Sequence, residues 1–154
     1  MPVTRIVTGD WARGREIEVI EAVQSAMLAA LKIPDWDRDV TVDTYSDTQR
    51  IVPTGRSQRF TRVEITMFAG RSIETKRSLY KTLVQNLAAL GVPELEIKIV
   101  LNEQPLENWG VRGGLPASEI ELSFKVDIYS DNRAGAFTIR KRPYRHNRRT
   151  ADFA

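Results

Sequence analysis

Few groups in this chain are suited to proton chemistry. The sequence has no cysteine, which excludes disulfides, thiolate nucleophiles and zinc–thiolate sites. Its one histidine, His146, lies in the basic stretch RKRPYRHNRR, where a solvated role is the simplest interpretation. A Ser–His–Asp triad or a multi-histidine metal site within one chain is therefore excluded. Proton transfer near neutral pH must come from carboxylates, a perturbed lysine or tyrosine, or the α-amino group, whose unperturbed pKa is about 7.7–8.0.

The basic character of the chain is confined to its C-terminal end. The net charge is +3, but residues 133–154 carry seven Arg or Lys side chains against Asp152, which gives them +6 and leaves residues 1–132 with −3. A body of negative charge is not expected to bind nucleic acid. We expect residues 133–154 to form a basic, flexible tail.

The size and composition indicate one packed domain, because 42% of the 154 residues are hydrophobic. No segment approaches the roughly 20 apolar residues of a membrane helix, and the start MPVTRIVTGD lacks an apolar signal core. We therefore expect a cytoplasmic protein with no membrane partner. No metal and no organic cofactor are expected, since the ligand types for them are missing.

The elements that must position these groups come in two copies. The segments LAALKIPDWD at 28–37 and LAALGVPELE at 87–96 agree in five of their first seven letters, at an offset of 59 residues. Each copy predicts a strand, a helix, a proline-marked turn and a strand. We assign the repeats to about 2–46 and about 60–103, within a single domain of residues 1–132.

Hydrophobic spacing predicts helices over about 14–31 and 73–90 and strands over 3–7, 40–45, 62–68 and 96–101. The expected buried stripes are Ile17, Ile20, Val23, Met27, Ala30 and Leu31 on the first helix, and Leu79, Leu83, Leu87 and Leu90 on the second. Ser72 is placed to cap the second helix and Gly91 to end it.

The predicted fold class is α/β (α+β). Each helix joins two strands across a long crossover, so each strand pair is expected to be parallel. Two tandem βαβ repeats then give a four-stranded sheet with both helices on one face. An extra C-terminal strand is predicted at about 119–129, where apolar and polar residues alternate. The other sheet face is uncovered; we expect it to be apolar and buried by oligomerisation.

Three features of the sequence occur in a fixed order: Pro2 opening the first strand, GRS-x-E-x-K at 70–76, and ENWG-x-RGG at 107–114. Together with the two βαβ units, they resemble the tautomerase superfamily, and within it the two-unit, malonate semialdehyde decarboxylase-like branch. The resemblance covers roughly residues 2–118. It implies a tautomerase-like fold, a homotrimer, and cofactor-independent chemistry on a small carboxylate substrate, a 2-oxo acid or its enol.

The resemblance implies three catalytic residues: Pro2, Arg71 and Asp37. Once Met1 is removed, Pro2 matches the amino-terminal proline that serves as general base, because partial desolvation and nearby cations disfavour its protonated form. Arg71 matches the substrate arginine, whose guanidinium binds a carboxylate through two hydrogen bonds and stabilises an enolate. Asp37 matches an aspartate that hydrogen-bonds the proline nitrogen or orients a water. Its alternative role is that of a turn residue.

Two further residues are expected to bind substrate. Trp109 matches an aromatic wall of the pocket, and the glycines around it permit tight turns close to a ligand. The decarboxylase branch carries a second arginine two residues before the first, where this chain has Ala69. Arg112 is a candidate replacement for that arginine.

Three functions stay open. A keto–enol tautomerase of small 2-oxo acids needs only a base and one charge-stabilising group, which Pro2 and Arg71 supply. A decarboxylase of a malonate-semialdehyde-type β-keto acid is the second, and Ala69 weakens it. The third is a non-catalytic trimeric scaffold whose tail, residues 133–154, binds a polyanion. Hydrolytic dehalogenation is disfavoured, because Phe68 and Ala69 occupy the stretch where a second arginine is needed.

Overall fold

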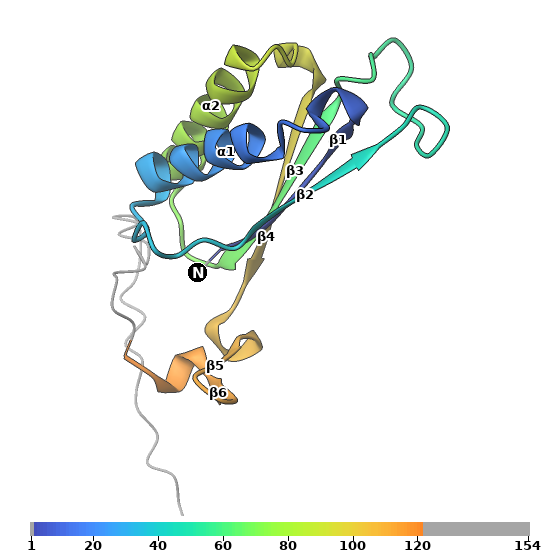
Figure 1. Ribbon diagram of the computed structural model, residues 1–154. Coiled ribbons are helices and arrows are strands. Elements are labelled where there is room, and N and C mark those ends of the chain that lie inside the picture. Colours follow the sequence, from blue (N-terminus) through green and yellow to red (C-terminus); the bar gives the residue numbers. More distant parts are fainter. Residues whose placement is uncertain (1, 122–154) are drawn as a thin grey trace, which may run out of the picture.

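Two helices pack on a four-stranded sheet in the computed structural model, which describes residues 2–121 (Figure 1). The elements are β1 (Val3–Gly9), α1 (Glu16–Leu31), β2 (Val40–Tyr45), β3 (Thr61–Phe68), α2 (Ile73–Ala89), β4 (Ile97–Gln104), β5 (Gly110–Val111) and β6 (Leu115–Pro116). Short 3-10 turns include Leu106–Asn108 and Ala117–Glu119. Almost all of the strand predicted at 119–129, and the whole tail predicted at 133–154, lie outside the described residues.

The sheet has the order β2-β1-β3-β4. As predicted from the crossover helices, β1 is parallel to β2 and β3 is parallel to β4. The central strands β1 and β3 are antiparallel, with Val3 opposite Thr66 and Ile6 opposite Val63. The two βαβ units therefore run in opposite directions, and an approximate twofold axis between β1 and β3 relates them.

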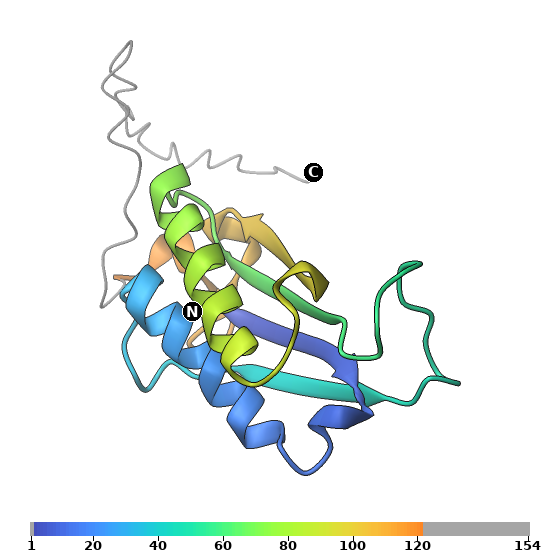
Figure 2. The ribbon, with the colours of Figure 1, turned by 90° about the horizontal axis from the view of Figure 1, so that it is seen from above.

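Both helices cover the same face of the sheet (Figure 2), as predicted. The core between the layers is formed by Ile6, Val19, Val23, Ala26, Met27, Leu31, Val63, Ile65, Leu79, Leu83 and Leu87, all of them buried. The prediction for Ile17 is wrong, because its side chain is 71% exposed while Val19 is fully buried. Two residues turn a helix by about 200°, so Val19 facing the sheet places Ile17 on the outside.

The sheet face away from the helices is charged, so the expectation of an apolar open face is wrong. The Nε atom of Arg5 on β1 donates to Asp43 on β2 at 2.6 Å, and Nε of Arg62 donates to Glu64 at 2.6 Å on β3. Side chains alternate along a strand, so Arg5 and Val7 point to this face while Ile6 points to the core. Burial of this face by another subunit would have to accommodate these ion pairs.

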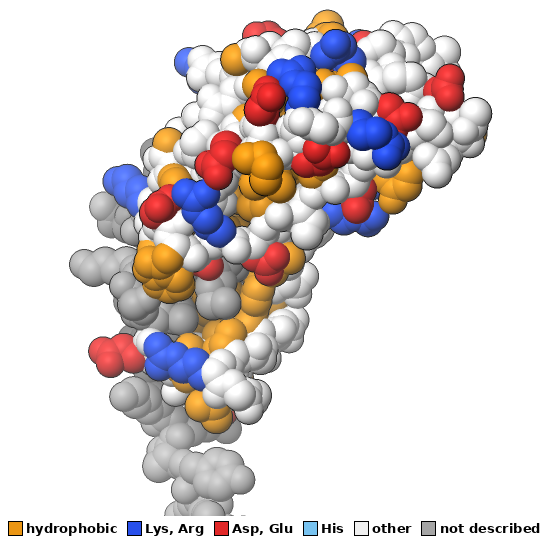
Figure 3. Space-filling model, in the orientation of Figure 1, with side chains coloured by type: hydrophobic (Ala, Val, Ile, Leu, Met, Phe, Trp, Pro, Cys, Tyr) orange, Lys and Arg blue, Asp and Glu red, His pale blue; other side chains and the backbone are white. Residues whose placement is uncertain are grey.

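Charged side chains of both signs are spread over the helical layer (Figure 3). Arg38, for example, donates to Glu21 at 2.8 Å and to Asp35 at 2.7 Å. Such exposed pairs contribute little stability, typically about 0–1 kcal/mol. Neither helix of the described part of the chain is long and apolar enough to cross a membrane.

The connector between the repeats, residues 46–60, folds back over the end of β1. Nη2 of Arg50 donates to the Gln58 carbonyl at 2.8 Å. The backbone N–H and the hydroxyl of Ser57 both donate to the carboxylate of Glu96, and these hydrogen bonds hold the pKa of Glu96 below its usual value. Gly9 permits the close approach, since a Cβ atom there would lie 2.1 Å from the Gln58 carbonyl oxygen.

We predict that Gly9→Ala destabilises the fold. The added methyl group forces the connector off the end of β1, which corresponds to overpacking of about 1–3 kcal/mol. Chemical denaturation measures the change in the free energy of unfolding. Gly110→Ala is the matched control, because a Cβ atom there meets nothing within 4 Å. Equal stability of the two variants would contradict the close approach.

Candidate functional site

One end of the sheet gathers Pro2, Asp37 and Arg71. β1 and β2 begin at this end, and β3 and β4 finish there, because the central strands are antiparallel. Pro2 directly precedes β1, and the Thr4 N–H donates to the Asp39 carbonyl at 2.8 Å just before β2. All three candidates are buried; Asp37 is 7% and Arg71 6% exposed. A buried arginine and a buried aspartate at one sheet end make it a candidate site for a small charged ligand.

Arg71 is fixed by the turn between β3 and α2. Gly70 has a φ of 114°, a conformation that glycine adopts readily and other residues rarely do. Ser72 caps α2, as predicted, by accepting a hydrogen bond from the Thr75 N–H at 3.2 Å. The Ala69 N–H donates to the Gln104 carbonyl at 2.9 Å and ties the turn to the end of β4. Arg71 therefore sits at the positive end of a 17-residue helix, which adds to its attraction for an anion.

Asp37 lies in the loop before β2, next to the buried side chain of Gln24. Its N–H donates to the Pro34 carbonyl at 3.0 Å, a contact that also fits its alternative role as a turn residue. Gln24 on α1 is 1% exposed and donates from Nε2 to the Asp37 carbonyl at 3.5 Å. Burying a glutamine in an apolar core costs free energy, which this hydrogen bond partly offsets. The same hydrogen bond connects α1 to the loop that carries Asp37.

Trp109 packs against Phe68, a residue that the sequence prediction did not include among the site residues. Phe68, at the end of β3, is 3% exposed and meets the Trp109 ring edge-on, with 4.9 Å between the ring centroids. The Ala117 N–H donates to the Trp109 carbonyl at 2.9 Å and holds it in place. The indole Nε1 of Trp109 is buried and has no hydrogen-bond acceptor among residues 2–121.

Arg112 forms no hydrogen bond or ion pair with Pro2, Asp37 or Arg71 in the described part of the chain. It lies in the turn of the β5–β6 hairpin with a φ of 47°, is exposed, and donates to the Glu121 carbonyl at 3.4 Å. The hairpin extends beyond the end of the sheet (Figure 1).

A lysine and a glutamate that the sequence prediction did not assign pair between α2 and β4. Lys76, in the first turns of α2, donates to Glu103 on β4 at 2.6 Å. The second carboxylate oxygen of Glu103 is buried and accepts no hydrogen bond from the described residues. Lys76 could have been identified from the sequence, because it is the last residue of the GRS-x-E-x-K motif. Its pairing with Glu103 could not, because it depends on how β4 pairs with β3.

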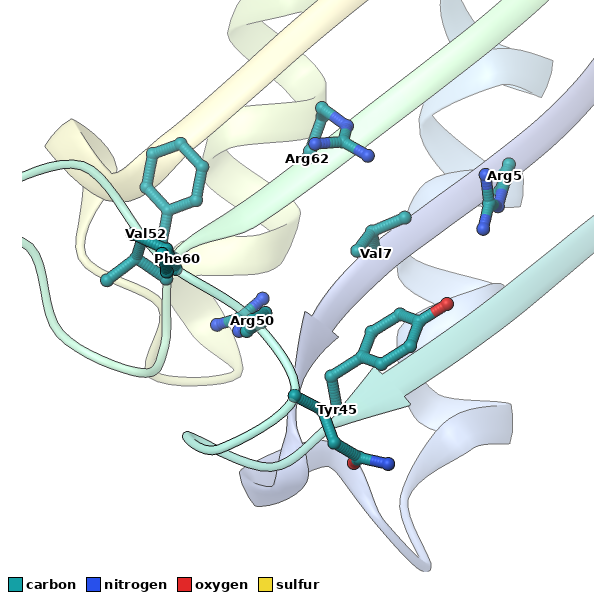
Figure 4. Close-up of a pocket in the computed structure, with 9 residues that line it drawn as sticks. Arg5, Val7, Tyr45, Arg50, Val52, Phe60 and Arg62 are labelled. Carbon is teal, nitrogen blue, oxygen red and sulfur yellow. The ribbon is translucent and has the colours of Figure 1, made fainter.

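A cavity lies on the open face, at the end of β1 opposite Pro2 (Figure 4). Its volume is about 320 Å³, and its lining includes Arg5, Arg50, Arg62 and Tyr45 around Val7. The sequence gave no indication of it, because its residues come from β1, β2, β3 and the connector. It contains none of the residues predicted for catalysis.

Comparisons with known proteins identify relatives of this chain. The model of the family described as "Tautomerase enzyme" matches residues 37–112. A probable tautomerase of Ralstonia nicotianae is 35% identical over 52 residues, which cover 33% of this chain and 74% of that protein. A 2-hydroxymuconate tautomerase of Comamonas testosteroni is 33% identical over 51 residues, covering 32% of this chain and 81% of that protein.

Solved structures share the fold over most of the described residues. FG41 malonate semialdehyde decarboxylase, inhibited by 3-bromopropiolate, superimposes with a TM-score of 0.68 at 26% identity and covers 78% of this chain and 98% of its own. A symmetric trimer of a fused 4-OT gives a TM-score of 0.68 at 22% identity, covering 75% and 96%.

We predict that Ser72→Ala destabilises the protein by about 0.5–2 kcal/mol, because the first turn of α2 loses its cap beside Arg71. Ser78→Ala is the matched control: it makes the same substitution at an exposed position of the same helix. Denaturant unfolding of both variants measures the difference. A Ser72 variant as stable as the Ser78 variant would contradict the capping role.

Proposed function

Because this chain belongs to the tautomerase superfamily, we propose that it is a cofactor-independent keto–enol tautomerase of small 2-oxo acids, with Pro2 as general base. The observation that supports this most is the burial of Pro2, Asp37 and Arg71 together at one end of the sheet. That end combines a candidate base with a cation for the substrate carboxylate.

The proposed reaction moves one proton between carbon and oxygen. After removal of Met1, the pyrrolidine nitrogen of Pro2 is a secondary amine with a free electron pair. It accepts a proton from the carbon next to the ketone, and the electrons of the broken C–H bond shift to the carbonyl oxygen as an enolate. The protonated Pro2 nitrogen then gives its proton to that oxygen, directly or through a water, which forms the enol and restores the free amine. The reverse path, with protonated Pro2 delivering its proton to carbon, converts an enol to the ketone.

Arg71 has two proposed roles in this scheme. Its guanidinium binds the substrate carboxylate through paired hydrogen bonds. Since it precedes the first turn of α2, it also places positive charge where the enolate develops. Both effects are strengthened by burial, because water screens charges less in a buried site.

The remaining residues shape the pocket in this proposal. Trp109 and Phe68 form an apolar wall against the substrate, and the Trp109 Nε1, which has no acceptor among residues 2–121, is a donor available to a substrate oxygen. Asp37 hydrogen-bonds the protonated Pro2 nitrogen or orients a water, with Gln24 steadying its backbone. No cofactor is needed for these steps.

Decarboxylation of a malonate-semialdehyde-type acid is the second candidate. It is supported by the structural likeness to FG41 malonate semialdehyde decarboxylase, which is covered over 98% of its length. In that case protonated Pro2 would polarise the carbonyl while carbon dioxide leaves. Ala69 argues against it, because it stands where the decarboxylase-like branch has a second arginine. Release of carbon dioxide from malonate semialdehyde would favour this candidate.

We also propose a homotrimeric assembly in the cytoplasm. The fused 4-OT that shares this fold is described as a trimer. In such an assembly the β5–β6 hairpin, which carries the exposed Arg112 and extends beyond the sheet, can bring this arginine to a neighbouring subunit. Sedimentation or light scattering of the full chain tests the trimer: a monomeric mass would contradict it.

We predict that Pro2→Ala lowers kcat/KM for phenylpyruvate or 2-hydroxymuconate by about 10²–10⁴-fold, the usual contribution of a general base. Undiminished turnover in this variant would rule out the assigned mechanism. The assay follows enol–keto conversion on samples whose thermal unfolding matches that of the unmodified chain.

Arg71→Ala is predicted to lower kcat/KM by about 10²–10³-fold, because the variant loses both carboxylate binding and enolate stabilisation. Arg71→Lys should recover only part of the loss, since an ammonium group lacks the paired donors. Arg77→Ala is the matched control: this arginine of α2 has a side chain that is 71% exposed and should leave turnover within about twofold. Equal effects of the Arg71 and Arg77 changes would exclude a specific role for Arg71.

A further inference from the structure

The cavity of about 320 Å³ on the open face has a lining that combines cations with apolar side chains. Figure 4 shows Arg5, Arg50, Arg62 and Tyr45 around Val7. Phe60 and Val52 add apolar surface from the connector. A volume near 300 Å³ is at the lower end of the range for small-molecule sites. The cavity is therefore large enough for a small organic ion.

The cavity lies at the sheet end that the twofold relation of the two βαβ units makes equivalent to the Pro2 end. The candidate site lies where β1 starts and β3 ends, and the cavity lies where β3 starts and β1 ends. The approximate twofold axis between the two strands therefore relates the Pro2 end of the sheet to the end where the cavity lies. Phe60, which directly precedes β3, occupies the place that Pro2 occupies before β1.

The two locations differ in the one group that the proposed chemistry requires. The nitrogen of Phe60 is a peptide N–H that donates to the Ser57 carbonyl at 3.1 Å. It has no free electron pair, so it cannot act as a base. The internal location therefore has no amine for proton transfer.

The cavity holds more positive than negative charge. Arg5 and Arg62 are paired with Asp43 and Glu64, each through Nε at 2.6 Å. Arg50 donates to the carbonyl and the side-chain oxygen of Gln58, at 2.8 and 3.3 Å, and forms no ion pair with a described carboxylate.

The surroundings of Arg50 disfavour its charge. Burial, followed by the like charge of Arg62, lowers the pKa of Arg50 below its usual value. An arginine is kept charged at such a place at a cost in free energy, which an anion would offset.

We propose that this cavity is a second, non-catalytic binding site for a small carboxylate that carries a short apolar or aromatic group. The carboxylate accepts hydrogen bonds from Arg50 and from the terminal nitrogens of Arg62, whose Nε is already used. The Tyr45 hydroxyl is a further donor. Val7, Val52 and Phe60 contact the apolar part of the ligand.

The source of the carboxylate is a free small acid and not a side chain of a neighbouring copy. The cavity combines apolar walls with the cations, and a single Asp or Glu side chain would leave Val52 and Phe60 without contacts. A free small acid and a side chain of a neighbouring copy can be distinguished by titration with a soluble acid. If the ligand is a free acid, the soluble acid saturates the site and the oligomeric mass does not change.

Calorimetric titration of benzoate into the full chain tests the proposal. The Arg71→Ala background is used, so that binding at the Pro2 end is weakened. Benzoate should bind saturably in this background, whereas neutral benzamide should not. Adding Arg50→Gln should weaken benzoate binding by about tenfold or more, because a charge-assisted hydrogen bond is lost. Arg56→Gln, at an exposed position of the same connector, is the matched control and should leave the affinity unchanged.

Arg62→Gln provides a second, independent test, and should also weaken benzoate binding by about tenfold if the Arg50 variant does not fold. Turnover of phenylpyruvate by Arg50→Gln alone should equal that of the unmodified chain, so this proposal can fail without affecting the proposed function. No saturable binding in the Arg71→Ala background would overturn it. The proposal would also be overturned if the chain did not bind benzoate and Arg50→Gln changed its sedimentation mass. Arg50 would then pair with a carboxylate of a neighbouring copy.

Discussion

The antiparallel pairing of β1 with β3 is the constraint on which the other features of the structure depend. It sets Val3 opposite Thr66, so the start of the chain lies beside the turn that carries Arg71. A shift of this register by one residue would turn Ile6 and Val63 out of the core, which makes the pairing strongly specified. The same pairing relates the two βαβ units by an approximate twofold axis, and it thereby creates two equivalent ends of the sheet.

The two ends of the sheet hold charge in different ways. At the Pro2 end, Arg71 is 6% exposed and stands at the start of a capped helix. At the other end, Arg50 donates to the Gln58 carbonyl within the connector, and the connector can pack on β1 only because Gly9 has no side chain. Desolvation of the buried Arg71 and of the half-buried Arg50 opposes stability, and both persist because the core of the two repeats is apolar and well packed. In the proposed mechanism only the Pro2 end has an amine, because the nitrogen of Phe60 at the other end belongs to a peptide bond.

Local patterns in the sequence predicted the helices, the parallel strand pairs and the Ser72 cap, because spacing and capping depend on neighbours along the chain. They wrongly placed Ile17 on the buried face of α1, where the structure has Val19. The charged open face and the cavity around Val7 could not be predicted, since they arise from strands that are distant in sequence. The roles of Pro2, Asp37, Arg71, Trp109 and Arg112 rest on the family resemblance and on their placement, and they stay predictions.

The measurement that tests the central claim most directly combines intact mass with turnover on the same untagged samples. Preparations in which Met1 has been removed to different extents are compared in the phenylpyruvate enol–keto assay. If the Pro2 nitrogen is the base, turnover rises in proportion to the fraction of molecules that lack Met1, because a retained methionine converts that nitrogen into a peptide amide. Full turnover by molecules that all retain Met1 would contradict the account.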